Sequence, residues 1–425
     1  MNAVCIVDSM VEDGVTEIRE YEFSDYDVPS VNLPDGLVRI GLCAFLNSTL
    51  ESIVIPDTVT TIGRGAFTGC AELESVRLPN GLENILSETF FECSKLHDIR
   101  MPTELDFIGN FAFYGCTSLK SIVIPNSVTD IGFNVFRDCA SLTAVRLPDQ
   151  TRRIRDSTFF GCHSLVSVHI PGELTHIGPN AFEDCHALTE IPFLPNLVKI
   201  GARAFRNCRS LPSFHIPTMV TRIGNNAFSG CHSLTDVRVP DGLTIIENNA
   251  FSGCRSLASI RFPDGLTTIG NNAFSGCHSL RSVRFPDSLT IIGEGAFAGC
   301  TNLTSIEFGN VQVGINATAF RPCPNVLCVM APTSDLADLG AARMEPTFSL
   351  QVVVTSESAR RRFYDLQFWT PETHVASGTA KDTVKTMMLC GTRSASRSGA
   401  INPLYLLPVE ILFMIFRYLP RTYPE

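Results

Sequence analysis

The sequence predicts a right-handed solenoid of stacked coils with one parallel β-sheet on its concave side. Two ladders of identical residues indicate this fold. Cysteine recurs every 23 residues from Cys70 to Cys323, and phenylalanine recurs with the same period from Phe67 to Phe320. Neither ladder misses a step over twelve units. Such a period is typical of an array in which each unit buries its apolar face only against its neighbours.

Each unit contains a short strand with one buried face. In the unit that begins at Cys254, apolar Ile260 and Phe262 alternate with polar Ser259 and Arg261. Because side chains of a strand point alternately to opposite faces, the apolar pair faces the core and the polar pair faces solvent.

The rest of the unit returns the chain to the next strand. Pro263 has no N–H group to donate and therefore ends the strand, and Asp264-Gly265 forms a turn. We expect Ala273 and Phe274 to close the coil on a short helical turn. A leucine ladder from Leu73 to Leu303 and an isoleucine ladder from Ile62 to Ile315 complete the predicted core.

The repeated motif resembles a known family. It reads I-G-x-x-A-F-x-G-C-x-x-L-x-x-[IV]-x-[IL]-P-x-x-[LV] over residues 31–331, and it is similar to the BspA-type (treponemal-type) leucine-rich repeats. The resemblance implies a leucine-rich-repeat solenoid of the α/β type. It also implies a role in interactions, which many members perform on microbial surfaces.

The flanks of the solenoid are predicted to differ from it. Residues 1–30 form an acidic N-terminal cap or a disordered segment. Residues 332–400 lose the period and read as an irregular linker with short helices, and residues 401–425 read as an amphipathic helix.

Composition excludes several classes of function. The chain has 425 residues and a formal net charge of −10, and its first 35 residues hold nine acids and one base. This balance argues against a nucleic-acid partner. No signal peptide and no apolar run of about 18 residues is present, so we expect no membrane association and a location in the cytoplasm or nucleus.

The cysteine ladder predicts buried free thiols. One cysteine per coil at one equivalent site fits a small side chain in a tight corner. Adjacent coils bring these thiols within disulfide reach, but a reducing compartment keeps them free. A ladder with one cysteine per coil offers no tetrahedral zinc site. The histidines that follow four ladder cysteines are expected to be exposed corner residues rather than metal ligands.

An outward row of basic side chains is the candidate binding site for a partner protein. It stands seven residues after the ladder cysteines and comprises Arg77, Arg100, Arg146, His169, His215, Arg238, Arg261 and Arg284. In four coils an aspartate follows three residues later, which predicts the pairs Arg146–Asp149, Arg238–Asp241, Arg261–Asp264 and Arg284–Asp287. The row is then either neutralised within each coil or a basic stripe for an acidic segment of a partner.

One coil departs from the pattern. Pro192 occupies an outward strand position, and the turn proline moves to Pro195. These prolines weaken local strand pairing. They mark either tolerated drift in one coil, or a bend or binding notch.

The C-terminal helix carries a second resemblance. Its sequence L-L-P-V-E-I-L-F-M-I-F-R-Y-L-P is amphipathic and resembles the opening of an F-box. The resemblance implies contact with a ubiquitin-ligase adaptor through Leu407, Pro408, Glu410, Ile411, Ile415, Phe416 and Leu419. The alternative is a helix that packs back on the end of the solenoid.

Together these features predict a monomeric, non-catalytic scaffold that binds a protein through its concave sheet. No catalytic motif, cofactor motif or metal-ligand spacing is present in the sequence. The alternative is a substrate receptor of an F-box-type ubiquitin ligase. A surface adhesin is disfavoured because the sequence shows no export signal.

Overall fold

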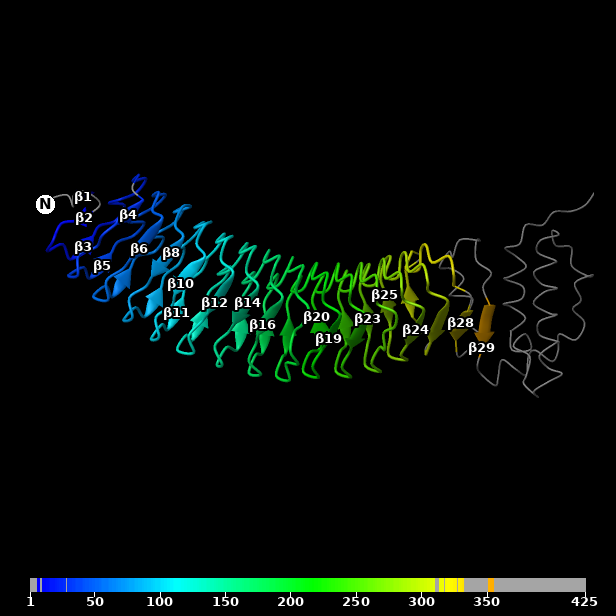
Figure 1. Ribbon diagram of the computed structural model, residues 1–425. Helices are drawn as coiled ribbons and strands as arrows, with labels where there is room; N and C mark the ends of the chain where they lie inside the picture. Colours follow the sequence, from blue (N-terminus) through cyan, green and yellow to red (C-terminus); the bar gives the residue numbers. More distant parts are fainter. Residues whose placement is uncertain are drawn as a thin grey trace, which may run out of the picture. The chain divides into compact units, whose positions relative to one another are not determined.

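Regular structure recurs with the period of the sequence. The computed structural model describes residues 6–7, 10–27, 29–309, 313–316, 318–326, 328–331 and 351–354. The chain divides into two units, residues 1–255 and residues 256–425. Within each unit the backbone winds through successive coils in chain order (Figure 1). Parallel pairing of strands one coil apart confirms the predicted solenoid.

In the first unit, one strand per coil forms what we call the first strand line. The strands pair in parallel and in register, as Val76 does with Ile53 on one side and Ile99 on the other. In β14, Val145 faces the core and Arg146 faces solvent, which is the predicted alternation. The strands of this line are β4 (Ser30–Val31), β6 (Ser52–Val54), β8 (Ser75–Arg77), β10 (Asp98–Arg100), β12 (Ser121–Val123), β14 (Ala144–Arg146), β16 (Ser167–His169), β19 (Ser213–His215) and β21 (Asp236–Arg238).

A second strand line, which the sequence did not predict, follows the proline turn of each coil. Each strand has two residues, an outward one and an isoleucine of the predicted ladder. These strands are β3 (Glu17–Ile18), β5 (Arg39–Ile40), β7 (Thr61–Ile62), β9 (Asn84–Ile85), β11 (Phe107–Ile108), β13 (Asp130–Ile131), β15 (Arg153–Ile154), β17 (His176–Ile177), β18 (Lys199–Ile200), β20 (Arg222–Ile223) and β22 (Ile245–Ile246).

The second unit has the same two kinds of strand. Its longer strands are β24 (Ser282–Phe285), β26 (Ser305–Phe308), β28 (Cys328–Ala331) and β29 (Gln351–Val354), which pair in this order. Its two-residue strands are β23 (Thr268–Ile269), β25 (Ile291–Ile292) and β27 (Gly314–Ile315).

The stack begins within the segment that the sequence analysis assigned to an N-terminal cap. Strand β1 (Ile6–Val7) pairs antiparallel with β2 (Met10–Val11). Strand β3 pairs in parallel with β5, and the ring of Phe23 stacks on Phe45 with centroids 5.3 Å apart. Residues 17–27 therefore cover the first ring of the phenylalanine ladder.

The third side of each coil is a turn, and the predicted short helical turn is wrong. We call the five residues before each ladder cysteine the turn ladder. In one coil Asn272 and Gly276 have φ of 54° and 72°, and left-handed residues interrupt an α-helix. The amide of Phe274 consequently points along the stack and donates to the carbonyl of Ala296 in the next coil at 2.7 Å. No α-helix is present in the part of the chain that the structure describes.

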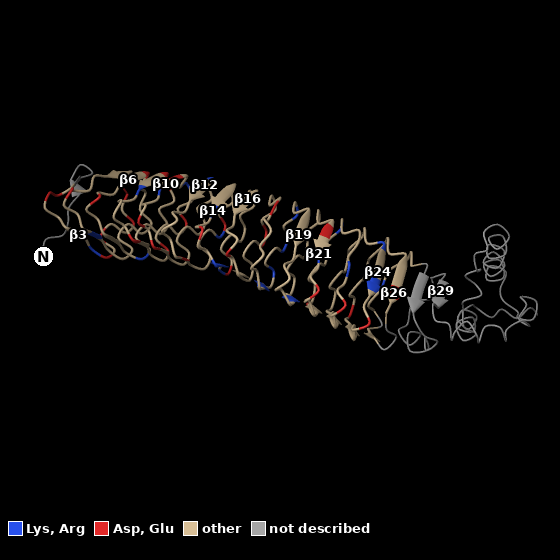
Figure 2. Ribbon diagram, turned by 90° about the horizontal axis from the view of Figure 1, so that it is seen from below, with Lys and Arg blue, Asp and Glu red and all other residues tan. Residues whose placement is uncertain are grey.

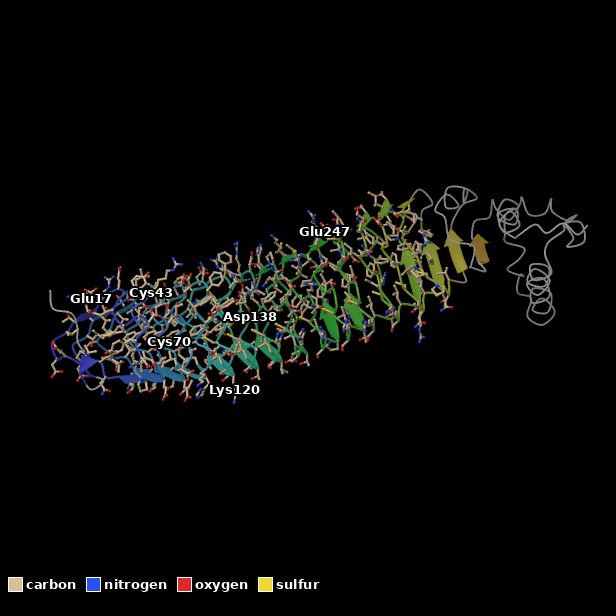
Figure 3. The ribbon with its side chains drawn as sticks, turned by 90° about the horizontal axis from the view of Figure 1, so that it is seen from above. Glu17, Cys43, Cys70, Lys120, Asp138 and Glu247 are labelled. Carbon is tan, nitrogen blue, oxygen red and sulfur yellow. The ribbon has the colours of Figure 1, made fainter. Side chains whose placement is uncertain are left out.

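Phenylalanine rings form the centre of the core (Figure 3). From Phe45 to Phe251 each ladder ring in the first unit is fully buried. Neighbouring ring centroids lie 5.3–5.7 Å apart with planes within 14° of parallel. In the second unit Phe274, Phe297 and Phe320 continue in the same way at 5.1 and 5.2 Å. Stacks of this kind add to the apolar burial of each ring.

The ladder cysteines are free thiols in the described part of the chain, and they are buried, as predicted. The structure also explains why the residue is cysteine. Each Sγ donates to the carbonyl of the ladder phenylalanine one coil back, as Cys93 does to Phe67 at 3.1 Å. Burial raises the pKa of Cys70 to about 11 and that of Cys323 to about 12. In the first full coil, buried Ser48 takes the position of the cysteine.

The coils approach most closely at the glycine that follows the buried isoleucine of the second strand line. A Cβ atom on Gly201 would lie 2.4 Å from the nitrogen of Pro179 and 2.6 Å from the carbonyl carbon of Gly178. A Cβ atom on Gly172, in the turn between the two strand lines, would meet nothing within 4 Å. Leu86 and Glu247 occupy the position of Gly201 in their coils, so local shifts can accommodate a side chain.

We predict that Gly201→Ala lowers the free energy of unfolding by about 1–3 kcal/mol, because the coils must separate locally. Gly172→Ala, the matched control, is expected to leave it unchanged or to raise it by about 0.4–1 kcal/mol through the unfolded chain. Urea denaturation followed by circular dichroism measures both. Equal effects of the two substitutions would contradict the observed coil spacing.

We also predict that the ladder thiols react with a thiol reagent only after unfolding. A raised pKa keeps these groups protonated at pH 8, and the thiolate is the reactive form. Titration of the native protein should detect partly exposed Cys43 and cysteines outside the ladder, whereas titration in guanidinium chloride should add the twelve ladder thiols. Ladder thiols that react at the rate of Cys43 in the native protein would show that they are not buried.

Candidate functional site

All eight side chains of the predicted basic row are exposed. In the first unit they stand at the third position of strands in the first strand line, where Arg77 lies beside Arg100, Arg146 beside His169, and His215 beside Arg238. In the second unit Arg284 lies in β24, whose basic segment is visible in Figure 2. Arg261 belongs to a coil without a strand at this position.

The row is not neutralised in the way that the sequence suggests. Arg146 pairs with Asp149 at 3.0 Å, as predicted. Arg238 instead lies 3.7 Å from Asp236. The structure contains no Arg261–Asp264 pair among its described ion pairs.

Two other arginines of the row find acids in adjacent coils. Arg77 lies 3.4 Å from Asp57, and Arg284 lies 3.4 Å from Glu307. Adjacent coils compete with the turn of the same coil because strands of a sheet lie only about 4.8 Å apart. Between 49% and 80% of each arginine side chain that is paired in the row remains exposed, so each pair contributes only about 0–1 kcal/mol.

The coil with Pro192 presents an aromatic ring on this face. As predicted, pairing is interrupted there, since residues 188–194 contain no strand. The extra proline shifts the register by one residue. Leu194 turns into the core with 2% of its surface exposed, and Phe193 turns outward with 56% exposed. The ring of Phe193 lies against His215, with centroids 4.6 Å apart.

Sequence reasoning identified the break but missed the exposed ring. Other coils hold a buried residue at the position of Phe193, such as Ile170 and Ile216. The available signal was the displaced turn proline, because a one-residue shift in a strand exchanges its inward and outward side chains.

A second aromatic cluster lies on the turn ladder. Phe91 stacks on Tyr114 at 4.7 Å, and the guanidinium of Arg137 lies 4.2 Å from the ring centroid of Phe160 and 5.9 Å from that of Tyr114. These rings are half-buried and pack on one another and on the arginine. The cluster therefore stabilises the surface of the stack through stacking and cation–π contacts.

Corner histidines make local contacts rather than a metal site. The rings of His163 and His186 stack at 4.7 Å, and His163 Nδ1 donates to the carbonyl of Asp184 at 3.0 Å. Burial lowers the pKa of His186, and the nearby Arg209 and His163 lower it further. Among the described residues, no group of three or more metal-ligating side chains is present.

The predicted adaptor-binding helix, residues 401–425, lies outside the described residues, as does the predicted linker at 332–400. Its contact with an adaptor stays a prediction. A search of the described segments for a helix long and apolar enough to cross a bilayer finds none.

Solved structures of leucine-rich-repeat proteins resemble this chain. A leucine-rich repeat protein from Bacteroides ovatus is 28% identical, with a TM-score of 0.63, over 81% of this chain and 94% of that protein. A leucine rich cell surface protein from Faecalibacterium prausnitzii is also 28% identical, with a TM-score of 0.50, over 79% of this chain and 93% of that one. No curated protein sequence matches the chain.

The family follows from the repeat itself. The model of the BspA type leucine rich repeat region matches residues 16–143, 106–235 and 221–341. These matches cover most of the chain and include residues of every coil described above. The protein belongs to the BspA-type leucine-rich-repeat family.

Proposed function

We propose that the protein is a non-catalytic scaffold that binds an acidic segment of a partner protein along the first strand line. The observation that carries this proposal is the exposed, weakly paired basic row. Opposite charges on a partner could replace its existing ion pairs at little cost, because each of those pairs contributes only about 0–1 kcal/mol. Complementary charge would also steer the approach of the partner.

The break at Pro192 adds an anchor to this surface. Binding energy at protein interfaces concentrates on a few aromatic and arginine side chains. Phe193 is exposed beside His215, and Arg238 follows on the next strand of the line. We infer that a partner would place an apolar side chain on Phe193 and its acids on the neighbouring coils.

Membership of the family supports an interaction role, since repeat stacks present extended surfaces for binding. The cell-surface role that the Faecalibacterium protein carries in its name belongs to that protein. For this chain, a location in the cytoplasm or nucleus stays a prediction. The alternative of a ubiquitin-ligase substrate receptor depends on residues 401–425 and is decided by whether an adaptor co-purifies with the full chain.

We predict that the variant Arg146→Glu with Arg238→Glu loses the partner. The full-length protein would be used as bait in an extract of its source cells, and retained proteins would be identified by mass spectrometry. A protein with an acidic segment should be retained by the wild type and fall below about one tenth of that amount with the double variant.

Arg203→Glu serves as the matched control because exposed Arg203 lies on the turn ladder of the same unit. It makes the same change of charge at one site and should leave retention unchanged. Unchanged retention by the double variant, or equal loss with the control, would contradict binding along the first strand line. Melting curves establish that all variants are folded.

A further inference from the structure

The second strand line carries its own run of cations, which the sequence analysis did not identify. Arg153 of β15 pairs in register with His176 of β17, and His176 pairs with Lys199 of β18. Ile200 pairs with Ile223, which places Lys199 beside Arg222 of β20. We call these four side chains the second-line stripe. They point outward because the isoleucine that follows each of them is buried.

The stripe is confined to four adjacent coils. Thr61, Asn84 and Phe107 hold the outward position in earlier strands of the same line, and Ile245 holds it in the strand that follows Arg222. The first unit also divides by charge. Residues 1–150 contain 22 acids and nine bases, whereas residues 151–255 contain eight acids and ten bases. The stripe thus lies in the basic part of an otherwise acidic unit.

Nearby acids leave the centre of the stripe uncompensated. Asp130 precedes Arg153 in the line, but both of its carboxylate oxygens bind Arg155 at 2.9 Å. Glu247 pairs with Arg222 at the other end. Among the described residues, Arg153 and Lys199 have no ion-pair partner. Burial lowers the pKa of His176, and Arg153 and Lys199 lower it further, which reports the positive field between them.

The spacing of the stripe distinguishes between forms of an acidic partner. Four strands about 4.8 Å apart span about 14 Å. On an α-helix, residues three and four apart lie on one face with about 5.4 Å of rise per turn, so four such acids span about 16 Å. In an extended strand, four acids on one face span about 20 Å. Flexible arginine and lysine side chains can absorb the small mismatch to a helix more easily than the larger mismatch to a strand.

We propose that the second-line stripe binds an acidic α-helix of a partner protein that lies along the stack and presents Asp or Glu at positions i, i+4, i+7 and i+11. Val198, with 42% of its surface exposed, stands beside Lys199 and offers an apolar contact at the edge of the helix. The first strand line suits this partner less well, because in the first unit Val123 and the coil of Pro192 limit its basic runs to two coils. A single nucleic-acid strand is disfavoured because no aromatic side chain interleaves the stripe to stack on bases.

The test uses a fluorescein-labelled helical peptide of about 15 residues with glutamate at those four positions. Its isomer has the same composition with the glutamates spread around the helix. Fluorescence anisotropy with the full-length protein at about 50 mM salt should show tighter binding of the striped peptide, and about 300 mM salt should weaken it. The variant Arg153→Glu with Lys199→Glu should weaken binding of the striped peptide by about tenfold or more.

Two controls separate this proposal from binding along the first strand line. Arg146→Glu with Arg238→Glu should change the affinity for the striped peptide by less than about twofold, and Arg203→Glu should do the same. Unaltered binding by the second-line variant, equal binding of the isomer, or displacement by a single-stranded oligonucleotide at lower concentration than the unlabelled peptide would each overturn the proposal. Loss with the first-line variant alone would place the helix on the other face.

Discussion

Contact between equivalent residues of adjacent coils is the interaction on which this structure depends. A coil has no core of its own, and its buried side chains lie against the same side chains one period away. Phe113 contacts the rings of Phe90 and Phe136 at 5.4 and 5.7 Å, and its amide donates to Val135 in the next coil at 3.0 Å. Any change in the length of one coil would therefore misalign rings, thiols and amides together.

The same constraint organises the surface. Since each position repeats about every 4.8 Å, outward side chains form rows whose chemistry follows from one position per coil. The core positions hardly vary, whereas outward positions change freely from coil to coil, and this is where binding properties can evolve. Phe193 shows how small the required change is, because a proline displaced by one residue turns a ring from the core to the solvent.

The core could be predicted from the sequence because identity at fixed spacing reports burial directly. The leucine, isoleucine, phenylalanine and cysteine ladders are all buried where described, apart from small exposures at the ends. The second strand line could not be recognised, because two residues are too few to show alternation. The turn ladder resembled a helix in its apolar pattern, but left-handed Asn272 and Gly276 direct the amides to the next coil.

The candidate site was predictable only in part, and geometry explains the difference. The exposed basic row follows from strand alternation, but its ion pairs depend on which coil supplies the acid. Arg284 reaches Glu307 of the next coil, which no rule for one unit could anticipate. The second-line stripe becomes visible only once Arg153, His176, Lys199 and Arg222 are known to share a face.

Deletion of one whole period tests the dependence on register most directly. Removing residues 117–139 joins Cys116 to Ala140 and keeps every ladder in phase, since the deleted segment is 23 residues long. Removing residues 117–128 deletes only part of a coil and shifts every later ladder. We expect the first variant to unfold cooperatively with a melting temperature within about 5 °C of the wild type, and the second to lose its cooperative transition. Similar melting curves for the two deletions would contradict the central role of contacts between equivalent residues.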